Sequence, residues 1–139
     1  MTTLVVDASV AAKWFFEEDH SDAAIRLISP RRRLLAPDLI WAEVGNVIWK
    51  RARRNEITED DARGIIADLL RMPLEITSTA THLPLAIELA MSTGRTVYDS
   101  LYLALAIERR CRLITADDRL LKSLAATPLA RHIRSLGRR

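Results

Sequence analysis

The sequence predicts an α/β domain built around a parallel sheet. Short apolar runs of strand length alternate along the chain with longer segments of helical periodicity. The chain has 139 residues, and because domains usually hold about 100–200 residues, we expect a single domain over residues 1–139. Ligands of such sheets bind at the carboxyl ends of the strands, so a functional site is expected there.

The first half of the chain predicts two strands, each followed by helices. One apolar run stops at Asp7 and a second at Pro37. Asp38 is the expected N-cap of a long helix whose apolar residues follow helical spacing. Thr58 and Asp61 form the capping box of the next helix. The predicted elements are strands over 3–6 and 34–37 and helices over 8–17, 21–29, 39–53 and 58–72.

The second half continues the alternation. It predicts strands over 74–77 and 112–115 and helices over 83–93, 98–110 and 117–126. Gly94 is the expected end of the first of these helices because glycine accepts the left-handed backbone of a C-terminal cap. Residues 128–134 are more typical of a turn and a basic helix than of a strand. The sheet is therefore expected to have four or five strands.

Composition excludes several classes of protein. Apolar residues make up 49% of the chain, and glycine and proline together only nine residues, which excludes collagen-like and disordered chains. One cysteine excludes a disulfide framework, and three scattered histidines argue against a histidine-built metal site. No apolar run is long enough to span a membrane, and the N-terminus lacks the pattern of a secretory signal. We therefore expect a cytoplasmic protein.

The common cofactor motifs of α/β proteins are absent, and carboxylates stand in unusual places instead. The chain has no glycine-rich dinucleotide or triphosphate loop and no serine nucleophile elbow. Asp7 and Asp117 each follow an apolar strand, while Glu43 and Asp99 lie on strongly apolar helices. Each also has a purely structural explanation: Asp7 and Asp117 as helix caps, Glu43 as a surface residue, Asp99 as a partner of the helix dipole. The adjacent Asp118 could take either role of Asp117.

Taken together, the four carboxylates suggest a metal site. Converging carboxylates repel one another unless a cation neutralises them. A site made only of oxygen ligands selects a hard cation, Mg²⁺ or Mn²⁺. One or two such ions can activate water and stabilise the leaving oxygen of a phosphodiester. Ser9, Thr115 and Asn46 are candidates to orient the carboxylates from outside.

Basic and aromatic clusters suggest partners. The net charge is +3, and residues 109–139 hold nine basic and two acidic side chains. Arginine-rich clusters suit phosphate contacts; solvated helix ends are the alternative. Five of the seven aromatic residues lie in the first 49 positions, and they could line a groove for a partner helix or fill the core. The candidate RNA contacts are Lys50, Arg51, Arg53, Arg54 and Arg95, and the candidate groove residues are Trp14, Phe15, Trp41 and Trp49.

Four segments resemble the motifs of PIN-domain nucleases of the VapC toxin type. They occur in the family's order from residue 5 to about residue 124. They are Leu4-Val5-Val6-Asp7-Ala8-Ser9, Leu39-Ile40-Trp41-Ala42-Glu43-Val44-Gly45-Asn46, Tyr98-Asp99-Ser100-Leu101-Tyr102-Leu103-Ala104-Leu105-Ala106 and Leu113-Ile114-Thr115-Ala116-Asp117-Asp118-Arg119-Leu120. One such motif is a weak indication; four in order are a strong one.

The resemblance implies a three-layer α/β/α domain and an Mg²⁺- or Mn²⁺-dependent endoribonuclease that inhibits translation or growth. It implies an acidic cluster of Asp7, Glu43, Asp99 and Asp117, with Ser9 and Thr115 at the family's hydroxyl positions. Asp117 is preferred to Asp118 because it lies two residues beyond Thr115. A VapB-type antitoxin that covers the acidic site, and a homodimer, are the implied partners.

Three other functions are weighed against this one. A noncatalytic PIN-like module that binds RNA or protein would not need all four acids. A phosphoacceptor receiver domain would need paired acids at the first strand and a lysine near the last, whereas Asp7 is followed by Ala8 and Ser9. A DNA nuclease would use the same residues, because the chemistry of phosphodiester hydrolysis is shared.

Overall fold

The computed structural model describes residues 1–137 and contains one five-stranded sheet in which every pairing is parallel. The strand order is β3-β2-β1-β4-β5, so the chain first builds outward from β1 on one side and then crosses to the other. This confirms the α/β prediction and its five-strand alternative. The strands are β1 (Thr2–Val6), β2 (Arg32–Pro37), β3 (Leu74–Thr77), β4 (Arg112–Thr115) and β5 (Ile133–Ser135).

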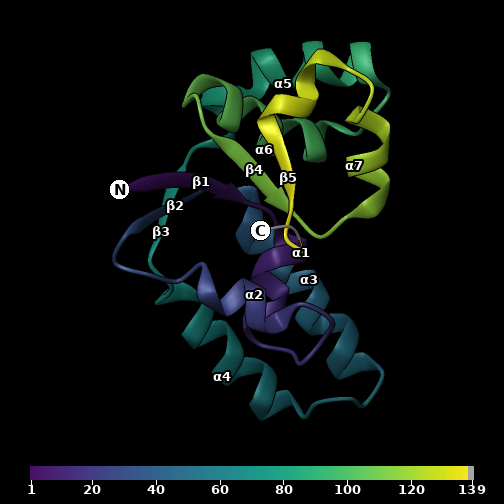
Figure 1. Cartoon of the computed structure of the whole chain (residues 1–139). Helices are drawn as coiled ribbons and strands as arrows, with labels where there is room; N and C mark the ends of the chain where they lie inside the picture. The colour runs from purple at the N-terminus through teal and green to yellow at the C-terminus, as the bar shows by residue number, and fades with distance from the viewer. Residues whose placement is uncertain (138–139) are drawn as a thin grey trace.

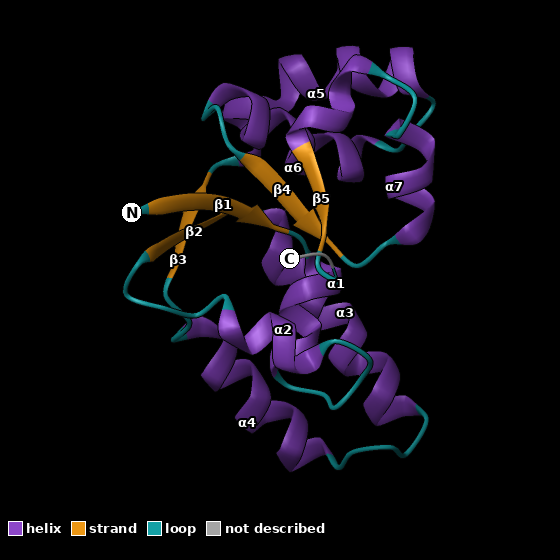
Figure 2. Cartoon of the chain, viewed as in Figure 1, coloured by secondary structure: helices purple, strands orange, loops and turns teal. Residues whose placement is uncertain are grey.

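Helices cover both faces of the sheet and give the expected three layers. Figure 2 shows the strands between a group formed by α1 to α4 and a group formed by α5 to α7. Within residues 1–137, none of the helices has the length and hydropathy that crossing a bilayer requires. The helices are α1 (Ala8–Ala11), the 3₁₀ helix η1 (Ala12–Trp14), α2 (Ser21–Arg26), α3 (Leu39–Arg53), α4 (Glu59–Leu70), α5 (Thr79–Thr93), α6 (Val97–Glu108), α7 (Asp118–Leu124) and the 3₁₀ helix η2 (Pro128–His132).

The core lies on both sides of β1 and β4. Val5, Leu113 and Ile114 are fully buried, as expected for strands covered by helices on both faces. In α6, every residue from Ser100 to Ala106 is buried. This explains why that helix lacks a polar face over its middle and why Asp99 is the only acid in its first turn.

Three predicted helix boundaries are wrong. The second predicted helix, α2, ends at Arg26 rather than at residue 29. The first helix ends at Ala11 and tightens into η1, so it does not reach residue 17. Helix α5 begins at Thr79 rather than at residue 83, and its early turn includes His82 and Pro84. Buried His82 contacts Glu108 through Nδ1 (2.5 Å) and Thr77 through Nε2 (3.1 Å), which ties α5 to α6 and to β3. Such contacts between distant segments are not visible in local periodicity.

The side chain of Asp38 caps a helix other than the predicted one. It makes no capping hydrogen bond to α3. Instead its Oδ1 accepts from the backbone N–H of Thr79 (3.0 Å), the first residue of α5, while its own N–H donates to the carbonyl of Thr77 (2.8 Å). Asp38 therefore joins the ends of β2 and β3 to the start of α5.

The C-terminal tail forms a strand where the sequence favoured a turn and a basic helix. Residues 128–132 make the 3₁₀ helix η2, and β5 then pairs with β4, with Thr115 opposite Ser135. Ile133 and Leu136 are buried. Their burial fixes the tail against the sheet, so the edge beside β4 is extended by one short strand (Figure 1).

Candidate active site

Asp7 lies at the carboxyl end of β1, and its carboxylate is almost completely buried (8% exposed). Its Oδ1 accepts from the Ser9 hydroxyl (2.5 Å) and from the Val10 backbone N–H (3.2 Å), and its Oδ2 accepts from the Thr115 hydroxyl. Burial raises the pKa of Asp7 to about 6, and the negative charge of Glu43 adds to the rise, although the three hydrogen bonds lower it. The helix-cap interpretation of Asp7 is therefore confirmed, and its role in a functional site stays a prediction.

The turn between β4 and α7 is bonded to this carboxylate. Ser9 Oγ accepts from the backbone N–H of Ala116 (2.9 Å), and the N–H of Asp117 donates to Thr115 Oγ1 (3.1 Å). The Asp117 carboxylate caps α7 by accepting from the N–H groups of its first turn. The neighbouring Asp118 is exposed. The backbone N–H of Asp117 is therefore linked to the Asp7 carboxylate through the Thr115 hydroxyl, whereas the Asp117 carboxylate caps α7.

Glu43 lies on α3 and is held by a tyrosine that the sequence analysis did not single out. The Tyr102 hydroxyl donates to Glu43 Oε1 (2.5 Å). Burial raises the pKa of Glu43, as does the charge of Asp99, against the opposing effect of the Tyr102 hydrogen bond. Tyr102 is itself buried, and burial and the Glu43 charge raise its pKa. A tyrosine in the middle of the apolar stretch from Leu101 to Ala106 was the available signal, because a buried hydroxyl needs a partner.

Asp99 lies in the first turn of α6 and forms an ion pair with Arg95 (3.0 Å). Its backbone N–H donates to the Thr96 hydroxyl, which caps the helix (3.1 Å). Arg95, predicted to contact RNA, therefore lies beside the acidic residues, and its buried Nε has no hydrogen-bond partner among residues 1–137.

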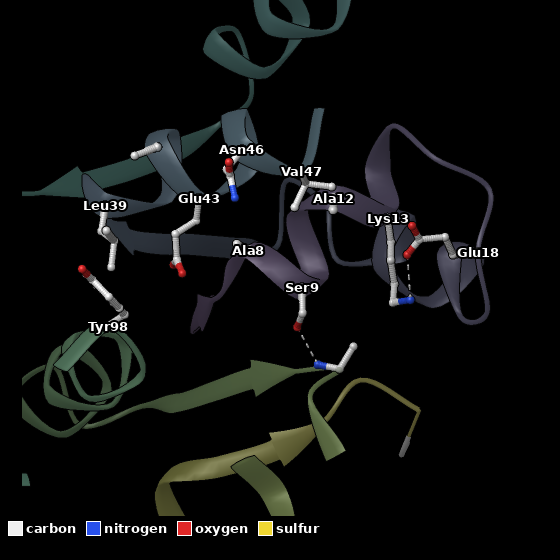
Figure 3. A pocket seen from close by; sticks show the side chains of 12 residues that line it. Ala8, Ser9, Ala12, Lys13, Glu18, Leu39, Glu43, Asn46, Val47 and Tyr98 are labelled. Carbon is white, nitrogen blue, oxygen red and sulfur yellow. Dashed lines mark hydrogen bonds and ion pairs between the residues drawn. The ribbon is translucent and has the colours of Figure 1, made fainter. Parts of the chain in front are cut away.

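A groove with a volume of about 790 Å³, here called the acidic groove, opens beside these residues. Figure 3 shows Ser9 from α1 and Glu43 from α3 facing this space, with Tyr98 from α6 at its edge. Asn46 also lines the groove, as expected from its place one turn after Glu43. Lys13 and Glu18 form an ion pair (3.3 Å) at its far end.

The donor set fits a hard divalent cation, although the carboxylates do not form a tight cluster. Asp7 feels the charge of Glu43, and Glu43 feels that of Asp99. All three offer oxygen, the ligand that Mg²⁺ and Mn²⁺ prefer. Over residues 1–137 no three His, Cys, Asp or Glu side chains lie close enough together to hold an ion. The fit therefore rests on donor chemistry and on two carboxyl groups that a cation would stabilise.

The other predicted contact residues fall into different surroundings. The Arg51 guanidinium pairs with Glu18 and with Glu56 (3.4 Å) and stacks over the Phe16 ring (4.2 Å from its centroid). Its charge is therefore used within the fold. Lys50, Arg53 and Arg54 are exposed at the end of α3, where they remain available to a ligand.

Of the four aromatic residues predicted to line a partner groove, three pack against the core and one is largely exposed. Trp14 donates from Nε1 to the Ala24 carbonyl (2.9 Å) and packs edge-on against Phe15. Trp14, Phe15 and Trp41 are half-buried against the core. Trp49 is 53% exposed and lines a separate hollow between α3 and α4. The core-packing alternative thus describes three of the four.

Known proteins are similar to this chain in both sequence and architecture. Residues 4–126 match the model of the PIN domain. The chain is 38% identical over 125 residues to Ribonuclease VapC3 of Pyrobaculum aerophilum, covering 88% of this chain and 95% of that protein. It is 33% identical over 130 residues to Ribonuclease VapC1 of Mycobacterium tuberculosis, with 92% of each chain covered.

Solved structures agree. The crystal structure of PAE2754 from Pyrobaculum aerophilum superposes with a TM-score of 0.71 at 25% identity, covering 97% of this chain and 84% of that one. A toxin–antitoxin complex from Klebsiella pneumoniae superposes with a TM-score of 0.64 at 17% identity, covering 96% and 97% of the two chains, and so shares the fold. The sequence motifs, the five-stranded parallel sheet and the acidic residues at its carboxyl edge all point the same way: this chain belongs to the PIN-domain family and, within it, to the VapC ribonucleases.

Proposed function

We propose that this protein is an Mg²⁺- or Mn²⁺-dependent endoribonuclease and the toxin of a type II toxin–antitoxin pair. The observation that carries the proposal is the buried carboxylate of Asp7, whose pKa is raised to about 6 next to Glu43. A fold does not retain a buried, charged acid at a sheet edge for stability, because desolvation opposes it. The names of the two ribonuclease relatives support the same activity.

In this proposal, Asp7, Glu43 and Asp99 would move together around the cation when it binds, because over residues 1–137 they do not form a ready ligand set without it. Asp117 organises the adjoining turn. When bound, the cation supplies positive charge that polarises the scissile phosphodiester and offsets the charge on the departing oxygen. The hydroxyls of Ser9 and Thr115 fix the orientation of Asp7, and Tyr102 fixes that of Glu43.

No covalent nucleophile is required. Burial raises the pKa of the Cys111 thiol, which keeps it in the unreactive protonated form. Cys111 also lies just before β4, at the opposite end of that strand from Thr115. Hydrolysis by water is therefore the reaction that the chain's own groups favour.

The proposed partners follow from the same assignment. A VapB-type antitoxin would cover the acidic groove; the toxin–antitoxin complex that shares this fold supports an antitoxin as the partner. A homodimer is proposed as the free form, supported by the exposed apolar side chains of Leu83, Ile87 and Met91 one turn apart on α5. Inhibition of translation or growth in the cytoplasm would follow from the cleavage of cellular RNA.

The test is cleavage of total RNA by purified protein in Mg²⁺, in Mn²⁺ and in EDTA. Asp99→Asn is expected to lose at least 100-fold in rate, because it removes one carboxylate charge from the cation site. Asp19→Asn is the matched control, since it changes the same chemical group on an exposed residue that does not line the groove. Cleavage that needs metal and is absent only in Asp99→Asn supports the proposal.

Other outcomes would contradict the proposal. Equal cleavage by wild type and Asp99→Asn would identify a contaminating nuclease. Absence of both cleavage and Mg²⁺ binding in the wild type would favour the noncatalytic binding module. Faster cleavage of a DNA oligonucleotide than of the RNA of matched sequence would reassign the substrate.

A further inference from the structure

A second hollow lies at the β5 edge of the sheet, and its lining is basic. It has a volume of about 570 Å³ and is formed by β4, β5 and α7, which lie side by side in Figure 1. Arg112 from β4, Lys122 from α7 and Arg134 from β5 line it, with Asp118 as the only acid among its lining residues. Three cations against one carboxylate give this hollow, here called the basic groove, a net charge of +2.

The fold brings these cations together from distant parts of the sequence. Arg134 lies opposite Ile114 in the parallel register of β4 and β5. Because alternate residues of a strand share a face, Arg112 and Arg134 lie on the same side of the sheet. Helix α7 packs against β5 and contributes Lys122 to the same hollow. The excess of basic residues after Arg109 in the sequence is thus concentrated, in part, at one surface.

Within residues 1–137, these three cations form no ion pair. Arginines elsewhere do, such as Arg33 with Glu75 (2.8 Å) and Arg63 with Asp60 (3.0 Å), but none of the ion pairs in that part of the chain includes Arg112, Lys122 or Arg134. Arg134 Nε is also buried without a hydrogen-bond acceptor over the same residues. A buried donor of this kind is stabilised when a ligand supplies an acceptor.

The turn after β4 links the basic groove to the acidic groove along the chain. Ala116 lines the acidic groove and Asp118 the basic one, so Asp117 lies between them in the chain. Ser135 also lines the basic groove and pairs with Thr115, whose hydroxyl donates to Asp7. Arg112 is three residues before Thr115, which corresponds to about 10 Å along the strand. An RNA strand at the acidic residues would therefore have to extend by about this distance to reach Arg112.

We propose that the basic groove binds backbone phosphates of the RNA strand on one side of the scissile bond. Arg112 and Arg134 contribute guanidinium donors that suit phosphate oxygens, and Lys122 contributes a point charge. Contacts of this kind position a strand without reading its sequence. The choice of RNA as the polyanion rests on the proposed function; the presence of an anion site rests only on the unpaired cations.

The test is the salt dependence of RNA binding in EDTA, where metal-dependent cleavage does not occur. A fluorescein-labelled single-stranded RNA of about 12 nucleotides is titrated with wild type and with the triple variant Arg112→Gln, Lys122→Gln, Arg134→Gln at several salt concentrations. Each phosphate contact contributes about 0.7 to the slope of log affinity against log salt, so the slope should fall by about 2, with a loss of at least tenfold in affinity at low salt.

A matched control separates the groove from overall charge. The triple variant Arg26→Gln, Arg63→Gln, Arg71→Gln also removes three positive charges, but from exposed, ion-paired positions. It should leave the slope of log affinity against log salt unchanged. Both triple variants should unfold within about 3 °C of wild type, since surface substitutions have small effects. Arg134→Lys should keep the slope but lose several-fold in affinity, because it retains the charge and removes the buried Nε donor.

Equal changes of slope in both triple variants, or no change in either, would overturn the assignment. Loss of binding to an oligo-aspartate peptide with an unchanged RNA slope would also overturn it and would identify an acidic protein segment as the ligand. The proposed nuclease activity is refuted by a different result, the absence of Mg²⁺-dependent cleavage. A wild type that does not cleave RNA but shows the expected slopes would keep the groove and refute the nuclease.

Discussion

Replacing Asp7 by asparagine should stabilise the protein at neutral pH while abolishing its proposed activity. The structure gives the magnitude: burial raises the pKa of Asp7 from 3.8 to about 6. At about 1.4 kcal/mol for each pKa unit, the charged form of Asp7 destabilises the folded state by about 3 kcal/mol above pH 6. Asparagine carries no charge, and it caps helices as well as aspartate does.

The sign of the pH dependence follows from the same values. The folded protein binds the Asp7 proton more tightly than the unfolded chain does, so folding takes up a proton between about pH 4 and pH 6. Wild type should therefore lose about 3 kcal/mol of stability from this residue as the pH rises through that range. The Asp7→Asn variant should show no such loss, and its advantage over wild type should grow from near zero at pH 4 to its full value at pH 7.

The assay is urea unfolding followed by circular dichroism in EDTA at pH values from 4 to 7.5. At pH 7.5 the variant should also melt roughly 10 °C above wild type, as expected for about 3 kcal/mol in a domain of this size. Asp118→Asn is the control, because Asp118 is exposed and should change stability by less than about 1 kcal/mol. A variant less stable than wild type at pH 7.5, or a difference that does not change with pH, would refute the reasoning.

Two further predictions test the surroundings of the site. Tyr102→Phe removes the hydrogen bond to Glu43 and should lower Mg²⁺ affinity and cleavage rate by about 10- to 100-fold. Tyr98→Phe, which alters an exposed hydroxyl, should leave Mg²⁺ affinity unchanged, and an equal loss of Mg²⁺ affinity in both variants would show that Tyr102 does not act through Glu43. Asp38→Ala should destabilise the protein by about 1 kcal/mol through loss of the bond to Thr79. Ser78→Ala should cost less than about 0.5 kcal/mol, because Ser78 makes no capping bond with its side chain; chemical denaturation of both variants compares them, and the reverse order would be inconsistent with the observed cap.

The alternation of short apolar strands with helices was enough to predict the class of fold, because buried parallel strands must be apolar on both faces. The capping box at Thr58 was likewise confirmed, since both of its bonds join residues three apart. The boundaries that failed depend on distant contacts. Helix α5 starts early because Asp38 and Thr77 meet its first turn, and the tail forms β5 because Ile133 and Leu136 are buried beside β4.

The acidic residues could be identified from short stretches of sequence, whereas the groups that surround them could not. Asp7 and Asp117 follow apolar strands in the sequence, so their place at the sheet edge could be predicted. The bond between Tyr102 and Glu43 joins residues 59 positions apart, and no spacing rule connects them. The sequence suggested that Arg95 is a surface cation, but in the structure it forms an ion pair with Asp99 at the start of α6. Arg51 likewise forms an ion pair with Glu18.

The sequence by itself therefore determined the kind of protein: an α/β domain with an oxygen-rich site at the carboxyl ends of its strands. Hydrophobic periodicity and residue chemistry are properties of short segments, and they do not depend on how the rest of the chain folds. Only the tertiary structure decided which hydroxyls hold the carboxylates, which cations are already paired and which three remain around the basic groove. Those are contacts between elements that meet only when the sheet assembles, because parallel strands bring distant segments to one edge.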